Sequence, residues 1–117
     1  MGDQAKPKKG IAQLAYLQAD RSDPIHEVLL SGANAVGQEG VTNVEGRSMH
    51  TVQVTGPFTG SVELLGTLDD INFAPINADI AAPGIVTING FYRHIKAKVK
   101  TLTTGAISVY LSSARHG

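Results

Sequence analysis

The chain of 117 residues carries ten basic and ten acidic side chains, which cancel, and it contains no cysteine. This length provides one domain with a substantial core, and the lack of cysteine excludes disulfides, thiolate metal sites and cysteine nucleophiles. The balanced charge gives no overall field that would draw the protein to nucleic acid or anionic lipid. Because no apolar run reaches the roughly 18 residues of a transmembrane helix, we expect no membrane contact, and the polar N-terminus does not resemble a secretory signal.

The N-terminal segment shows no strand pattern. Residues 1–10 are polar and contain Pro7, and residues 11–19, IAQLAYLQA, form the one plausible helix of the chain. A helix this short is marginal on its own, and Pro24 disfavours helical backbone just before it. The segment can be a flexible tail or an arm that becomes ordered on a partner. We predict an N-terminal extended arm, residues 1–25, with at most one short helix.

From Ile25 onward apolar and polar residues alternate as they do in strands. Turn signals such as Gly56-Pro57 and Asn89-Gly90 recur roughly every 8–12 residues, and Pro75 suggests an edge strand or a bulge. The candidate strands occupy residues 25–32, 40–47, 48–56, 60–68, 71–80, 84–90, 91–100 and 106–114. The prediction is an all-β fold, a single β-sandwich or jelly-roll domain of about eight short antiparallel strands over residues 26–117.

The alternation also predicts which side chains face the core. His50 shares a face with Val52 and Val54, so we expect a semi-buried histidine with satisfied hydrogen bonds. Tyr110 is expected to point outward. The other residues expected to face inward are Val62, Leu64, Leu68, Ile95, Ala97, Val99, Ile107, Val109 and Leu111.

One adjacent acidic pair, Asp69-Asp70, lies in the stretch TLDDIN. A calcium loop needs oxygen ligands at alternating positions and a distal glutamate, whereas here Asn72 is the one further oxygen donor nearby. A catalytic dyad would need a second carboxylate, and Glu63 on the preceding strand is the nearest candidate. Aspartate bonds its own backbone and tolerates left-handed conformations. The pattern therefore favours a hairpin turn over a weak calcium site or a catalytic pair.

No pattern in the chain indicates catalysis. The four histidines, His26, His50, His94 and His116, show no metal-ligand spacing and no neighbouring Ser/Asp pattern of a triad. Phosphate loops, nucleophile elbows and dinucleotide fingerprints are also missing from the sequence. We expect that the protein is not an enzyme and uses no metal or other cofactor.

The segment FYRHIKAKVK places a basic row on one side of a strand. Such a row beside an aromatic is typical of a nucleic-acid strand face, and it is equally typical of a solvated edge or of a protein contact. Because the net charge is zero and one aromatic accompanies the row, we favour the second interpretation and expect no nucleic-acid partner. The residues of this row are Tyr92, His94, Lys96, Lys98 and Lys100.

The order of several motifs resembles that of small β-sandwich virion proteins of tailed bacteriophages. The resemblance covers residues 48–113 and includes GSVELLGTLD at residues 60–69. After Asp69 the chain departs from the family pattern, which often continues with glycines and an aromatic. The other matching positions are Phe73, Pro75, Ile76, Gly90, Tyr92, Arg93, Ile95, Ala97, Val99, Thr104, Gly105, Ile107 and Val109.

The resemblance implies a structural role on a phage head, neck or tail tip. We expect a capsid decoration (cement) protein that is made in the host bacterial cytoplasm and binds the major capsid protein on the outer capsid surface of the virion. Capsid sites are threefold or twofold, so sister copies should form a homotrimer or homodimer. Contacts are expected from the arm and, laterally, from the basic row: Lys6, Lys8, Lys9, Leu14, Tyr16, Leu17, Tyr92, Lys96 and Lys98.

The alternative is a tail or head-fibre recognition module that binds host-surface glycan. Jelly rolls often serve this purpose, but sugar sites depend on exposed aromatic rings. This chain has no tryptophan and three tyrosines, so we favour the decoration protein.

Overall fold

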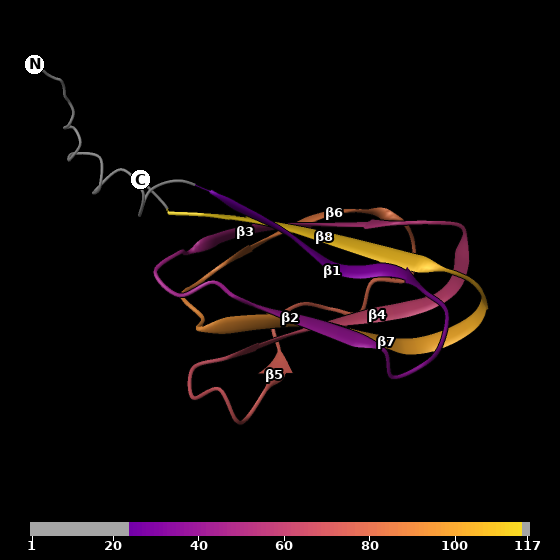
Figure 1. Ribbon diagram of the computed structural model, residues 1–117, viewed down its shortest axis with the longest axis horizontal. Helices are drawn as coiled ribbons and strands as arrows, with labels where there is room; N and C mark the ends of the chain where they lie inside the picture. The colour runs from indigo at the N-terminus through magenta and orange to yellow at the C-terminus, as the bar shows by residue number, and fades with distance from the viewer. Residues whose placement is uncertain (1–23, 116–117) are drawn as a thin grey trace, which may run out of the picture.

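The computed structural model describes residues 24–115, and residues 1–23 and 116–117 lie outside that description. Within the described range the chain forms strands and no helix. The strands, seen in Figure 1, are β1 (Ile25–Ala33), β2 (Glu39–Asn43), β3 (Met49–Thr55), β4 (Phe58–Thr67), β5 (Ala74–Pro75), β6 (Gly84–Asn89), β7 (His94–Gly105) and β8 (Ile107–Ala114).

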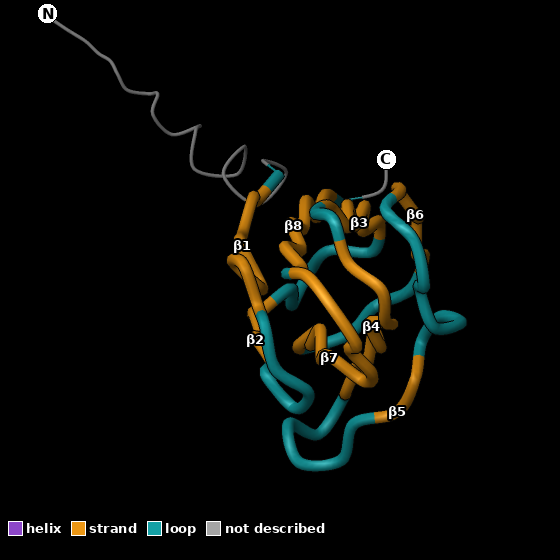
Figure 2. Tube along the Cα trace, turned by 90° about the vertical axis from the view of Figure 1, so that its right-hand side faces the viewer, coloured by secondary structure: helices purple, strands orange, loops and turns teal. Residues whose placement is uncertain are grey.

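The strands form two four-stranded sheets packed face to face. Sheet A has the order β1-β8-β3-β6 and sheet B the order β2-β7-β4-β5, with every pairing antiparallel. Figure 2 shows the two sheets as layers of the sandwich. Strands that follow each other in the chain, such as β1 and β2 or β7 and β8, lie in opposite sheets, which is the arrangement of a jelly roll. The predicted all-β sandwich is confirmed.

The core lies between the sheets and is built from the inward faces of the strands. The inward residues predicted for β7 and β8 are all buried, and the most exposed of them is Leu111 at 2%. Side chains buried on one face at every second position are what the period of a strand requires. The core residues that carry no remaining exposure are Val44, Val52, Val62, Leu64, Ile95, Ala97, Val99, Ile107 and Val109.

The prediction for Leu68 is wrong, because this side chain is 68% exposed. Strand β4 ends at Thr67, and the Thr67 hydroxyl accepts hydrogen bonds from the backbone N–H groups of Asp69 and Asp70. The chain therefore turns out of the sheet before Leu68, so the alternation of β4 no longer sets its direction.

The candidate strand at residues 71–80 is much shorter than predicted. Only Ala74 and Pro75 pair with β4, opposite Gly66 and Leu65. Pro75 lies on the edge of sheet B, as its missing N–H group requires. Beyond it, Ile80 makes an isolated antiparallel bridge to Val62 of β4.

His50 is fully buried and joins three parts of the fold. Its Nε2 lies 2.9 Å from the Gly90 carbonyl and its Nδ1 lies 2.7 Å from Ser113 Oγ. Because a carbonyl only accepts, Nε2 carries the hydrogen, and Nδ1 accepts from the Ser113 hydroxyl. The Tyr92 ring packs against the imidazole with 5.8 Å between centroids. The predicted satisfied histidine is confirmed, with complete rather than partial burial.

We expect Leu64→Ala to lower the free energy of unfolding by about 2–5 kcal/mol, because it leaves a cavity in the core. Leu68→Ala removes the same atoms from an exposed site and should change it by less than about 0.5 kcal/mol. Urea denaturation of both variants measures this difference. Equal losses would contradict the end of β4 at Thr67.

We expect the stability to fall as the pH drops below 6.5, in part because burial lowers the pKa of His50 from that value in the folded protein. Below the unfolded pKa the unfolded chain binds the proton more readily than the folded one, so protons favour unfolding. Urea denaturation between roughly pH 5 and pH 8 should show a weaker pH dependence for His50→Gln than for the wild type. His26→Gln, at an exposed site, is the matched control. Identical pH dependence in the wild type and His50→Gln would contradict the buried neutral imidazole.

Candidate interaction surface

Apolar side chains form a row across the outer face of sheet A. Val28 of β1 pairs in register with Tyr110 of β8, and Tyr110 pairs on its other side with Gln53 of β3. Gln53 in turn pairs with Ile85 of β6. Residues paired across strands project to the same face, so these four side chains, of which Gln53 is polar and the others largely apolar, cross the whole sheet and form the apolar row. Val28, Tyr110 and Ile85 are 57%, 41% and 64% exposed.

The apolar row lies in an open groove of about 330 Å³. The next row of the sheet contributes His26, Thr51 and Ser112 to its lining, and Glu27 is the one Asp, Glu, Lys or Arg side chain among the lining residues. An exposed strip of aliphatic and tyrosine side chains with few charges has the composition found at the centre of protein interfaces. The outer face of sheet A can therefore bind another protein surface.

The outer face of sheet B is charged, and two of its lysines, Lys96 and Lys100, form ion pairs within the molecule. Lys96 Nζ lies 2.9 Å from Glu39 Oε1 and 4.1 Å from the centroid of the Phe73 ring. The hydrogen bond from Lys96 lowers the pKa of Glu39. Lys98 lies between Glu39 of β2 and Glu63 of β4 in the register of the sheet. The basic row of the sequence is thus interleaved with acidic and aromatic partners, as a solvated sheet face is.

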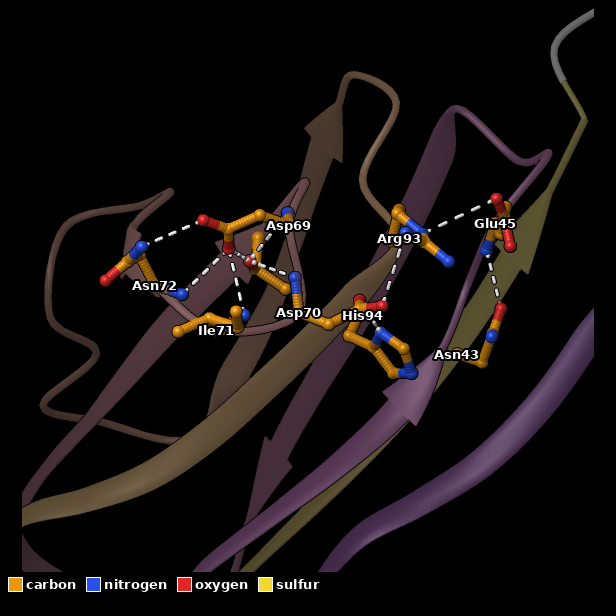
Figure 3. Close-up of polar contacts among 9 residues, drawn as sticks. Asn43, Glu45, Asp69, Asp70, Ile71, Asn72, Arg93 and His94 are labelled. Carbon is orange, nitrogen blue, oxygen red and sulfur yellow. Dashed lines mark hydrogen bonds and ion pairs between the residues drawn. The ribbon is translucent and has the colours of Figure 1, made fainter.

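The end of sheet B carries a second group of polar contacts, which Figure 3 shows. Asp70 Oδ1 lies 2.6 Å from His94 Nδ1, and Asp70 Oδ2 lies 3.4 Å from Arg93 Nη1. Arg93 Nε also lies 3.6 Å from Glu45 Oε2. These side chains are partly exposed, so each pair contributes little free energy. Together they hold the β4–β5 turn against the start of β7.

The acidic pair forms a turn, as predicted. Asp69 Oδ1 accepts the backbone N–H groups of Asn72 at 2.8 Å and Ile71 at 2.9 Å, as well as the Thr67 hydroxyl at 2.9 Å. Asp69 Oδ2 accepts from the Asn72 side-chain amide. These hydrogen bonds hold the pKa of Asp69 well below its usual value, and the bond from the Asn72 backbone N–H has the largest effect. Asp70 has φ +66°, a conformation that aspartate tolerates better than most residues.

The predicted contact residues do not gather at one place in the described structure. Tyr92 is half-buried beside His50 and leaves no space for a side chain at Gly66, whose Cβ would lie 2.8 Å from the Tyr92 ring. Lys96 and Lys98 lie on the outer face of sheet B, away from the apolar row. The predicted arm contacts lie outside the described residues: Lys6, Lys8, Lys9, Leu14, Tyr16 and Leu17.

Sequence reasoning missed the apolar row, although it predicted correctly that Tyr110 points outward. Val28, Gln53 and Ile85 are distant in the sequence, and strand register alone places them beside Tyr110. The usable signal was the outward position of Tyr110, an aromatic residue between Ser108 and Ser112 on the outer side of β8.

Residues 24–115 include no group of three or more His, Asp or Glu side chains placed to hold a metal ion. A helix suited to crossing a bilayer is likewise absent from this range.

No protein-family model matches the chain, and no curated protein matches it in sequence. Among solved structures it is similar to the SPBc2 prophage-derived protein YomS, with a TM-score of 0.68 and 13% identity over 78% of this chain and 92% of that one. It is also similar to the PBSX exported protein XepA, with a TM-score of 0.70 and 18% identity over 78% of this chain, which spans 37% of XepA. At these identities the likeness shows the fold, which this chain shares with two proteins of prophage origin.

We expect Asp69→Ala to lower the Tm, because four donors in the turn lose their acceptor. Asp69→Asn retains one acceptor oxygen and should lower it less. Asp79→Ala is the control, since the Asp79 carboxylate has a single exposed partner, Lys100, and should matter little. Thermal denaturation followed by circular dichroism measures all three, and equal Tm values for Asp69→Ala and the wild type would contradict the capping role.

The same measurement with added calcium distinguishes the turn from a weak calcium site. We expect the wild-type Tm not to change with calcium, because the Asp69 oxygens are already occupied by donors of the turn. A calcium-dependent rise that is lost in Asp69→Asn with Asp70→Asn would overturn the interpretation as a simple turn.

Proposed function

We propose that the protein is a structural component of a bacteriophage virion, and specifically a capsid decoration (cement) protein. The observation that carries this proposal is the apolar row on the outer face of sheet A, in a fold that is shared with prophage proteins. In this proposal the protein binds the major capsid protein on the outer surface of the head, stabilises the shell by the area it covers, and catalyses no reaction.

In this proposal the two outer faces of the sandwich have different roles. The face of sheet A offers apolar side chains that gain free energy when they are removed from water. The face of sheet B holds two of its lysines in ion pairs within the molecule, Lys96 with Glu39 and Lys100 with Asp79. Breaking those pairs on docking would cost desolvation without a new partner. Sheet A therefore suits the docked side, and sheet B suits the side that faces solvent.

The N-terminal arm, residues 1–25, supplies the second part of the attachment in this proposal. Its last residue, Ile25, is already the first residue of β1, whose Val28 belongs to the apolar row. An arm that binds beside a docked face acts at a high effective concentration, so two weak contacts give strong attachment.

The test uses phage heads assembled without this protein, to which purified variants are added. Deletion of residues 1–20 and the double variant Val28→Glu with Tyr110→Glu should each reduce occupancy on heads at least about tenfold, or about 1.4 kcal/mol. Val41→Glu is the matched control, because Val41 is 53% exposed on an edge strand of sheet B. Occupancy is measured by quantitative electrophoresis of sedimented heads, and circular dichroism confirms that each variant is folded.

Unchanged occupancy after the deletion would overturn the role of the arm, and equal loss in Val41→Glu would overturn the choice of sheet A. Binding of the isolated protein to host-surface glycans on an array, without binding to heads, would support the alternative of a recognition module.

A further inference from the structure

The sandwich has four strands at sheet edges, β1 and β6 in sheet A and β2 and β5 in sheet B. The outer side of an edge strand presents unpaired backbone N–H and C=O groups, on which another chain can add a strand. Proteins usually prevent this with charges, bulges, prolines or very short edge strands. The four edges of this protein differ in whether they carry such protection.

Three of the edges are protected. The pairing of β1 with β8 is interrupted by two register shifts, and Gly32 within β1 has φ +59°. Strand β2 begins with the charged residue Glu39. Strand β5 has two residues, one of which is Pro75.

The edge at β6 carries none of these features. Its six residues, GIVTIN, include no charge and no proline, and they pair with β3 without a register shift from Met49–Asn89 to Val54–Gly84. Its Ile85 side chain is 64% exposed, and Thr87 is also exposed. Among residues 24–115 no strand covers its other side. A regular, uncharged edge of this length is a ready template for strand addition.

We propose that β6 pairs antiparallel with β6 of a second copy of this chain, which joins the two A sheets into one. A pairing of identical edges is isologous and closes after two copies, so it removes both open edges at once. Pairing of β6 with any other edge of a neighbouring copy would meet the bulges, charges or proline described above. The finite dimer is therefore the arrangement that these edges allow.

The segments that flank β6 complement each other in such a dimer. Phe91, just beyond its C-terminal end, is 67% exposed, and the exposed residues just before its N-terminal end, 81–83, are Ala-Ala-Pro. Antiparallel pairing centred on the middle of β6 brings Phe91 of each copy opposite residues 81–83 of the other. An exposed aromatic side chain at one end thus meets small apolar residues at the other end, twice in the dimer.

The twofold axis of this dimer is perpendicular to the joined sheet, so both copies present the outer face of sheet A to the same side. The two apolar rows then lie on one continuous surface and approach each other at Ile85, the member of the row that lies on β6. The pairing goes beyond the proposed function and does not depend on it, since it can be tested on the purified protein alone.

Sedimentation equilibrium of the full chain should give twice the chain mass of 12.3 kDa. Thr87→Lys should give the monomer mass, because it places two like charges together at the shared edge. Ser112→Lys adds the same charge to the same row of the sheet, in β8 at its centre, and should leave the dimer intact. A wild-type monomer throughout the concentration range would overturn the proposal. Dissociation by Ser112→Lys as well would show contact through the sheet face instead of the edge.

Single cysteines identify the edge directly, because the chain has none of its own. Facing residues of an antiparallel pair project to the same side. Near the centre of the paired strands, Ile85 and Thr87 of one copy can therefore lie opposite only Ile85, Thr87 or Asn89 of the second copy. Mild oxidation of Ile85→Cys, Thr87→Cys or their equimolar mixture should yield covalent dimers in at least one sample. Val28→Cys on β1 and Val41→Cys on β2 are exposed controls that should remain uncrosslinked. Crosslinks in these controls with none at β6 would overturn the pairing.

Discussion

The packing of the inward faces of β7 and β8 is the constraint on which the rest of the structure depends. These strands follow each other in the chain, yet each lies inside a different sheet, so their side chains fill the middle of the sandwich from both sides. Because interiors are densely packed, the fully buried Ile95 and Ile107 fix which side of each strand faces outward. The register of β8 then aligns Tyr110 with Val28 and Gln53, and the register of β7 aligns Lys98 with Glu39 and Glu63.

The strands with regular alternation could be predicted from the sequence, since burial on one face imposes a period of two. The turn at Asp69 was also predictable, because the preference of aspartate for such turns is local. Leu68 was placed wrongly, since the Thr67 side chain ends β4 one residue earlier. Lys96 contacts Glu39 and Phe73, which come from separate parts of the chain. No local sequence pattern could therefore reveal these two contacts. The apolar row was missed for the same reason, and the arm stays a prediction.

The contrast between the two outer faces arises from sequence positions of the same kind, the alternate residues that point away from the core. On β7 these positions hold lysines, and on the strands of sheet A they hold Val28, Tyr110 and Ile85. Exposed ion pairs add little to stability. The charges of sheet B therefore serve mainly to keep that face in contact with water and to prevent its association with other molecules. An apolar side chain exposed on sheet A gains nothing in an isolated domain. Its contribution comes when another surface covers it.

The pairing of β1 with β8 has a consequence for the order of events in the cell. Ile25, in β1, lies opposite Ser113, in β8, so sheet A cannot be completed until residue 113 has left the ribosome. Contacts between residues so distant in sequence also make folding slow. Val28 and Tyr110 come together only at this final step. A chain that lacks β8 therefore also lacks the assembled apolar row, and with it the surface that we propose for docking.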